Sequence, residues 1–287
     1  MSKALIDTTV LVNGLMKSKD ISNRMKSAME KFDQTRLPAY ALKEYREGPL
    51  QAHVWLYNKL VLFNSLNIAY ASIQSIRRHK NKQSTAQEAL TLADTSIASK
   101  LGTGGNFVKK YGARASIEQV RTDEIKFFLQ KKIIQSWENR RKFTTIVDKE
   151  LDCFPERKPK LKKQGIYDLS PNKCSNPENC CLAKEMAKDP DAINKMREAL
   201  KPVLKDKQEN QKRSKALKKL TNRSLNTFTH NECKSLGDAA FAFYCKKDEV
   251  ILTTNIIDHR ILATSLGKRA VDPTAPRLTD AYKKVAA

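Results

Sequence analysis

The sequence predicts an α/β protein whose parallel sheet, flanked by helices, is built by the two ends of the chain around a large, mainly helical insertion. Short apolar runs alternate with helical patterns at both ends of the chain, whereas the pattern between them is that of long helices. The 287 residues suffice for one or two domains. We therefore expect a discontinuous domain at 1–49 and 230–287, with an insertion at 50–229.

The first segment predicts two strands and two helices. An apolar run at 4–6 is typical of a buried strand, and a helical pattern follows it directly. Residues 21–32 predict a helix with one apolar face. A short strand at 37–39 and a helical turn at 41–47 complete the segment. The Gly48-Pro49 pair is a strong stop signal, so we expect the helix to end there.

The insertion changes character along its length. Up to about residue 137 it carries enough large apolar residues for packed helices. The stretch 155–223 has 19 Lys and Arg against 9 Asp and Glu, six prolines and few large apolar residues. This composition predicts an exposed basic arm of loops and short helices.

The last segment returns to alternating elements: a helix at 236–246, a strand at 250–253, a helix at 256–266 and a short strand at 269–271. In a parallel sheet, chemistry lies beyond the carboxyl ends of the strands. The first predicted strand ends at Asp7. Because the later strand is followed by acidic and amide side chains, both ends of the chain direct acids to one edge of the sheet.

The net charge of +23 makes nucleic acid the first partner to consider, before an anionic membrane surface or simple solubility. No apolar run reaches the ~20 residues that span a bilayer, so we expect no membrane segment. Asp7 lies within the N-terminal apolar stretch, which is untypical of a signal peptide. Six scattered cysteines do not form a disulfide framework, and a reducing cytoplasm is the expected location.

Four segments resemble the PIN-domain nuclease family: Leu5–Val12, Leu37–Gly48, Ser235–Ala242 and Leu252–His259. The resemblance implies a PIN-like parallel sheet and metal-dependent hydrolysis of phosphodiester bonds, most often in RNA. It assigns catalysis and the binding of Mg or Mn to four acids, Asp7, Glu44, Asp238 and Asp258. Thr8, Thr9 and Asn255 become supporting residues. Thr9 stands where the family usually has Asn, and His259 where an aromatic Phe is common.

The residue types fit that chemistry, because Mg and Mn prefer oxygen ligands and converging carboxylates repel one another without a cation. Simpler roles stay open for each acid. Asp7 and Asp238 are also suited to helix N-termini, Glu47 competes with Glu44, and Asn255 competes with Asp258. The alternative function is a catalytically inactive PIN-like protein that binds nucleic acid or acts as an adaptor.

Two basic clusters of the insertion are candidate nucleic-acid contacts, with RNA favoured over DNA. Their residues are Lys158, Lys160, Lys162, Lys163, Lys212, Arg213, Lys215, Lys218 and Lys219. By analogy with the family, an inhibitor or antitoxin protein is a further candidate partner, and the oligomeric state is open. Zinc is a weaker candidate, at Cys153, Cys174, Cys180 and Cys181, because the spacing lacks a Cys-x-x-Cys pair.

Overall fold

A computed structural model describes residues 2–76, 80–101, 109, 111–112, 116–148, 158–169, 180–221 and 227–275. It contains a five-stranded parallel sheet in the order β3-β2-β1-β6-β7, which confirms the predicted fold class. The strands are β1 (Lys3–Ile6), β2 (Gln34–Leu37), β3 (Ile146–Val147), β6 (Glu249–Leu252) and β7 (Arg269–Val271). The middle of the chain therefore contributes the edge strand β3.

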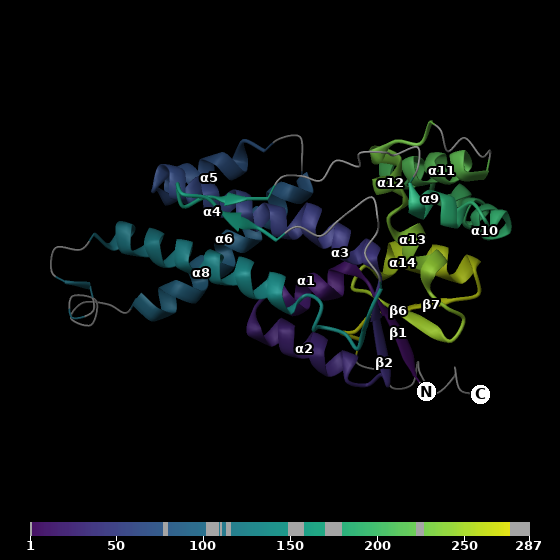
Figure 1. Cartoon of the computed structure of the whole chain (residues 1–287), viewed down its shortest axis with the longest axis horizontal. Coiled ribbons are helices and arrows are strands. Elements are labelled where there is room, and N and C mark those ends of the chain that lie inside the picture. The colour runs from purple at the N-terminus through teal and green to yellow at the C-terminus, as the bar shows by residue number, and fades with distance from the viewer. Residues whose placement is uncertain are drawn as a thin grey trace.

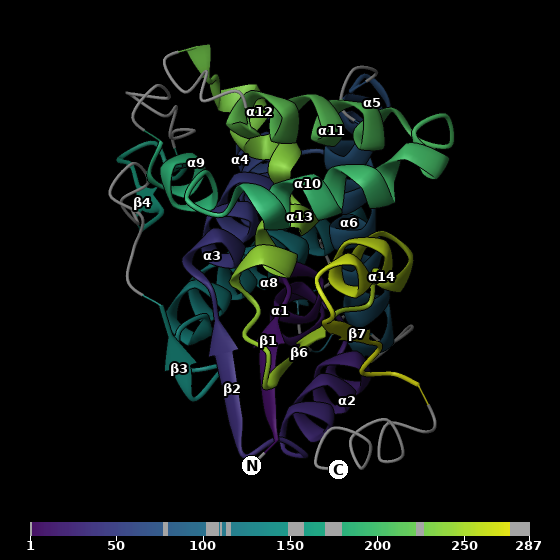
Figure 2. The same ribbon diagram turned by 90° about the vertical axis from the view of Figure 1, so that its right-hand side faces the viewer.

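The two ends of the chain meet at the centre of the sheet. Leu5 of β1 lies opposite Arg36 of β2 on one side and Ile251 of β6 on the other. In Figure 2, β1 and β2 run upward from the N-terminus, so their carboxyl ends face the helices drawn above the sheet. All four residues of β6 are buried, as expected for a strand covered on both faces.

Helices of the terminal segments flank the sheet. They are α1 (Thr8–Met16), α2 (Lys19–Met29), α3 (Ala39–Tyr45), α12 (His230–Leu236), α13 (Asp238–Tyr244) and α14 (Ile256–Ser265). Asp7 caps α1 by accepting hydrogen bonds from the Thr8 and Thr9 amides, and Thr229 with Glu232 forms a capping box on α12. The sequence thus provides acceptors for the free N–H groups at the start of these two helices.

The predicted helix end at Gly48-Pro49 is wrong. The chain passes from α3 through one π-helical turn, Arg46–Leu50, straight into α4 (Gln51–Phe63). Tyr45 and Leu50, on either side of the pair, are fully buried, so tertiary packing holds the helix together across the proline. The carbonyl of Pro49 contacts Nδ1 of the His53 ring at 2.9 Å.

The middle of the chain is mainly helical, as predicted. Figure 1 shows its first helices extending away from the sheet. They are α4, α5 (Leu66–Gln74), α6 (Lys80–Leu101) and α8 (Ile117–Asn139). No helix in the described ranges is both long and apolar enough to cross a membrane.

The basic arm has more buried structure than its composition predicted. A small antiparallel hairpin, β4 (Lys160–Leu161) with β5 (Tyr167–Asp168), packs on α4 through Asn58. It is followed by α9 (Cys181–Met186), α10 (Pro190–Leu200), a 3₁₀ turn (Lys201–Val203) and α11 (Gln208–Thr221). Ile193 and Met196 of α10 and Leu217 and Leu220 of α11 are buried. Figure 2 shows α10, α11 and α12 above the carboxyl ends of the strands.

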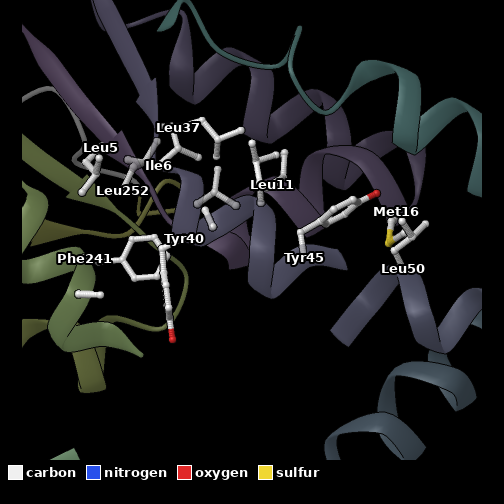
Figure 3. Close-up of a cluster of buried hydrophobic side chains, with 14 of the residues drawn as sticks. Leu5, Ile6, Leu11, Met16, Leu37, Tyr40, Tyr45, Leu50, Phe241 and Leu252 are labelled. Atoms are coloured by element: carbon white, nitrogen blue, oxygen red, sulfur yellow. The ribbon is translucent and has the colours of Figure 1, made fainter. Parts of the chain in front are cut away.

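The core joins both ends of the chain, as Figure 3 shows for side chains from β1, β2, β6, α3 and α13. Tyr40 of α3 and Phe241 of α13 meet edge to face, with ring centroids 5.8 Å apart. The Tyr40 hydroxyl donates to the Cys233 carbonyl at 3.1 Å and accepts from the Gly237 amide at 3.2 Å. The helix carrying Glu44 and the helix beginning at Asp238 are thereby held in one arrangement.

A buried arginine also ties the strands together. Arg36 of β2 donates from Nε and Nη2 to both carboxylate oxygens of Glu249 on β6, at 2.9 and 2.6 Å. Its Nη1 donates to Asp148 at 2.9 Å, next to β3, and Nη2 also reaches the Tyr244 carbonyl at 2.7 Å. Such a bidentate ion pair is strong because its geometry is fixed and little water competes with it.

We expect Glu249→Gln to destabilise the fold by about 2–3 kcal/mol, because hydrogen bonds to a charged partner are lost while Arg36 stays buried. Urea unfolding measures this change. Asp248→Asn is the matched control, because it removes one negative charge from the preceding residue, whose pair with Lys3 is exposed. Equal unfolding midpoints for the two variants would contradict the role given to Arg36.

Candidate functional site

Asp7 lies at the carboxyl end of β1, and its carboxylate accepts hydrogen bonds from hydroxyl and amide groups of Thr8, Thr9 and Thr253. Oδ1 accepts from the Thr8 amide at 2.6 Å, and Oδ2 accepts from the hydroxyls of Thr9 at 2.6 Å and Thr253 at 2.8 Å. Thr253 directly follows β6, so the ends of two neighbouring strands orient the same group. The side chain is almost fully buried.

Glu44 comes from α3 and meets the same strand end. Its Oε2 accepts from the Thr8 hydroxyl at 2.7 Å, and the Thr8 amide binds Asp7, so one residue links the two acids. Burial, and then the nearby charges of Asp7 and Asp238, raise the pKa of Glu44 to about 7. Among the described residues it forms no ion pair, so this acid lacks a neutralising cation.

Asp238 is the first residue of α13 and follows Gly237, whose φ of +43° belongs to a region that favours glycine. Its Oδ1 lies 3.2 Å from Nε2 of His259, and Oδ2 accepts from Nη2 of Arg213 at 2.7 Å. Burial acts to raise the pKa of Asp238, but His259 and Arg213 outweigh it and lower that pKa below its ordinary value.

His259 brings two of the acids together. Its Nε2 lies 3.5 Å from Oδ2 of Asp7 as well as 3.2 Å from Asp238, and the ring is completely buried beside Phe241. Burial acts to lower the pKa of His259, yet the two carboxylates raise it to about 10. A protonated imidazolium therefore lies between Asp7 and Asp238. Because both acids lie within 3.5 Å of one nitrogen, they belong to one cluster, which we call the acidic pocket, although 231 sequence positions separate them.

Asp258 lies further out. Its Oδ2 accepts from the Asn255 side chain at 3.1 Å, and its Oδ1 pairs with the Lys207 ammonium at 2.6 Å. The side chain keeps 21% of its exposure. The backbone N–H of Asn255 donates to the Thr253 hydroxyl at 2.9 Å, so Asn255 connects Asp258 to the residues around Asp7. The predicted acids thus form a group of three, with Asp258 at the rim.

The alternative ligand Glu47 belongs to another cluster. It lies one turn after Glu44 and pairs with Lys43 at 3.5 Å, Lys234 at 3.5 Å and His230 at 3.9 Å. Glu44, by contrast, faces Thr8 and the acids. Of the two glutamates, only Glu44 contacts the residues that hold Asp7.

The basic candidates separate into exposed and buried groups. The four lysines of the hairpin region, at 158, 160, 162 and 163, are exposed, and so are Lys212, Lys215 and Lys218 of α11. Lys219 is half-buried and pairs with Glu232 at 2.6 Å. Arg213 is 7% exposed and bound to Asp238, so it belongs to the acidic pocket and not to the outer surface.

The structure describes two of the four zinc candidates, because Cys153 and Cys174 lie outside the described residues. Cys180 is buried with its sulfur 4.0 Å from that of Cys233, and Cys181 is half-exposed. Within the described ranges, no three His, Cys, Asp or Glu side chains are already arranged as ligands around one point. In the acidic pocket, His259 lies between the carboxylates of Asp7 and Asp238, and Arg213 lies beside Asp238.

Sequence reasoning did not assign His259, Arg213, Lys207 and Thr253 to the pocket. A signal existed for Arg213, because it shares the helical face of Ala216, Leu217 and Leu220, which are all buried. His259 lies four residues after Asn255, so it points back to the strand end that Asn255 follows. Nothing in the sequence indicated the contact of Lys207 with Asp258.

Comparisons of the chain with protein-family models, with curated proteins and with solved structures found no match. The geometry described above and the motifs of the sequence therefore carry the functional argument.

Proposed function

We propose that the protein is a metal-dependent endonuclease that hydrolyses phosphodiester bonds, with RNA as the favoured substrate. The observation that carries this proposal is the convergence of Asp7, Glu44 and Asp238 in one pocket at the carboxyl ends of β1 and β6. They come from segments far apart in the chain, and those segments are the ones that resemble PIN-domain nucleases. The resemblance supports both the reaction and the preference for RNA.

The pocket fits Mg or Mn by its donor chemistry. Carboxylate oxygens are the preferred ligands of these ions. Burial, and then the negative charges of Asp7 and Asp238, raise the pKa of Glu44, and a bound cation would offset that repulsion. Asp7, Glu44 and Asp238 would hold the ion, with Asp258 and Asn255 at the edge. A bound ion would activate water and neutralise charge on the phosphate.

The chain's own residues set the orientation of the acids in advance. Thr9 and Thr253 direct one oxygen of Asp7, and Thr8 holds Glu44 against it. Preorganised ligands lose little conformational freedom when a charged group binds, so these hydroxyls favour binding without taking part in bond cleavage. This is the supporting role that we assign to Thr8 and Thr9.

The test is a cleavage assay on single-stranded RNA and DNA of equal length. We expect internal cleavage of RNA with Mg or Mn, its loss with EDTA, and its return when excess metal is added back. Cleavage that is insensitive to EDTA would contradict the metal, and cleavage of DNA alone would contradict the substrate.

The second candidate is a protein of this fold that binds nucleic acid without cutting it. It is favoured by the cations already on the acids, namely His259 between Asp7 and Asp238, Arg213 on Asp238 and Lys207 on Asp258. RNA binding without cleavage in Mg or Mn would select this function.

Both functions predict that the exposed lysines of α11 bind phosphates. Lys212, Lys215 and Lys218 follow one another at helical spacing on the outer surface. Changing all three to Gln removes up to three phosphate contacts, so the slope of log affinity against log salt should fall by roughly two for single-stranded RNA. Fluorescence anisotropy across a salt series measures this slope.

The control for that experiment is Lys19, Lys26 and Lys31 changed to Gln, which removes the same charge from exposed positions in and just after α2. An equal reduction in slope for both triple variants would mean that net charge, and not α11, determines binding.

A further inference from the structure

Helix α11 carries an arginine from the middle segment into the acidic pocket. Arg213 is 7% exposed, and its Nη2 donates to Oδ2 of Asp238 at 2.7 Å. Its Nη1 lies 3.4 Å from Oδ1 of Asn210. The guanidinium packs beside Gly237, where a Cβ would lie 3.4 Å from Nη2, an ordinary contact distance. The chain thus brings a permanent positive charge beside the three acids.

The guanidinium of Arg213 is only partly used. Nε and Nη2 form one edge of the group, and this edge binds two oxygens of a carboxylate or phosphate in parallel. Nη2 is bound to Asp238, whereas Nε is buried and has no hydrogen-bond partner in the described part of the chain. A buried N–H without an acceptor costs free energy, so one more anionic oxygen at Nε would be stabilised there.

We infer that Arg213 is a catalytic residue that binds an oxygen of the phosphate group being cleaved, through the free Nε edge of its guanidinium. This inference rests on the proposed function and adds to it, because a residue of the middle segment then completes the pocket. Hydrolysis adds water across a P–O bond, and Arg213 keeps its proton throughout. Its contribution is charge and orientation where negative charge develops on the phosphate.

Lys207 supports the same picture at the rim. It directly precedes α11, and its half-exposed ammonium lies 2.6 Å from Oδ1 of Asp258. One short segment therefore supplies cations to the inner and the outer acids. We expect the terminal segments to need α11 for cleavage as well as for affinity.

The experiment compares Arg213→Gln and Arg213→Lys with the matched control Lys195→Gln, which removes one charge from an exposed position on the neighbouring helix α10. Cleavage of a 12-nucleotide uridine RNA gives kcat and KM, and anisotropy of the labelled RNA in EDTA gives affinity without cleavage. We expect Arg213→Gln to lower kcat by roughly 10²–10³-fold, as for loss of one donor to a developing oxyanion. Lys195→Gln should leave kcat unchanged.

Arg213→Lys keeps the charge and can keep the pair with Asp238, but it has no Nε edge. We expect kcat of this variant to be at least 10-fold below the wild-type value, because lysine lacks the planar pair of N–H donors of a guanidinium. If the arginine were merely structural, melting temperature would fall while kcat per folded molecule stayed at the wild-type value, and that result would overturn the inference. Added guanidinium ion should partly restore kcat to Arg213→Gln.

The proposed function and this inference fail in different ways. Wild-type cleavage with an unchanged kcat in Arg213→Gln overturns the inference alone. Absence of wild-type cleavage overturns the proposed function and the catalytic part of the inference together. The phosphate contact is then judged by binding in EDTA, where equal affinities of Arg213→Gln and Lys195→Gln overturn it as well.

Discussion

Replacing Glu44 by Gln should lower the rate of RNA cleavage by on the order of 10³-fold and, at the same time, stabilise the folded protein at pH 8. Glutamine has the same shape and keeps an oxygen that accepts from the Thr8 hydroxyl, so the fold has no reason to change. What disappears is a negative charge that binding a cation requires. Glu44 is the informative acid because, among the described residues, no cationic side chain pairs with it.

The stability gain follows from the pKa. Because the pKa of Glu44 is about 7 in the folded protein and 4.5 in the reference state, folding takes up a proton between these values. The free energy of unfolding therefore falls as pH rises from 4.5 to 7, and the full cost of ionising Glu44, about 3 kcal/mol, is present above pH 7. Glu44→Gln should remove this cost. Urea unfolding at pH 5 and pH 8 in EDTA measures the difference.

Glu47→Gln is the matched control, because Glu47 lies one turn away and contacts Lys43, Lys234 and His230 and not the acids. We expect cleavage per folded molecule to be unchanged in this variant. If Glu47→Gln abolished cleavage and Glu44→Gln did not, the assignment of the two glutamates would be reversed.

The sequence was sufficient for the fold class because the elements that define it are governed by local pattern. The buried strands β1 and β6 are continuous apolar runs, and each is followed by polar residues at the edge of the sheet. Asp7 could be placed for the same reason, because it follows a predicted strand, whereas Asp238 was assigned through the resemblance to PIN-domain nucleases. The edge strand β3 has only two residues and no such pattern.

The local sequence pattern could not predict which cations pair with the acids of the pocket. The cations on Asp7, Asp238 and Asp258 come from α14, α11 and the turn before α11, and only tertiary packing brings them to the acids. The predicted helix end at Pro49 was wrong for a related reason. The tendency of proline to break a helix was outweighed by the burial of Tyr45 and Leu50. Composition correctly marked the arm as basic but did not distinguish Arg213, which faces inward, from Lys212, which faces solvent.

Asp238→Asn should be the most destabilising change in the pocket, at roughly 3–5 kcal/mol, as well as abolishing cleavage. It removes the carboxylate that neutralises Arg213 and shares His259 with Asp7, and both cations are buried. A buried charge whose partner is removed costs more than the pair contributed, because water does not replace the lost partner. The unfolding midpoint in urea, measured in EDTA, checks the size of the effect.

The pH dependence identifies the cause. The pKa of His259 is about 10 when folded and 6.5 in the reference state, so its contribution to stability is fully present below pH 6.5 and is lost as pH rises toward 10. In Asp238→Asn only Asp7 remains beside the ring, so the decline of stability between pH 7 and pH 9 should become shallower. The double variant with Arg213→Gln should recover part of the lost stability, since one unpaired buried charge is gone, yet it should stay inactive. If Asp238→Asn kept both the wild-type midpoint and the wild-type pH slope, the two cations would not depend on Asp238, and the charge balance that we assign to the pocket would be wrong.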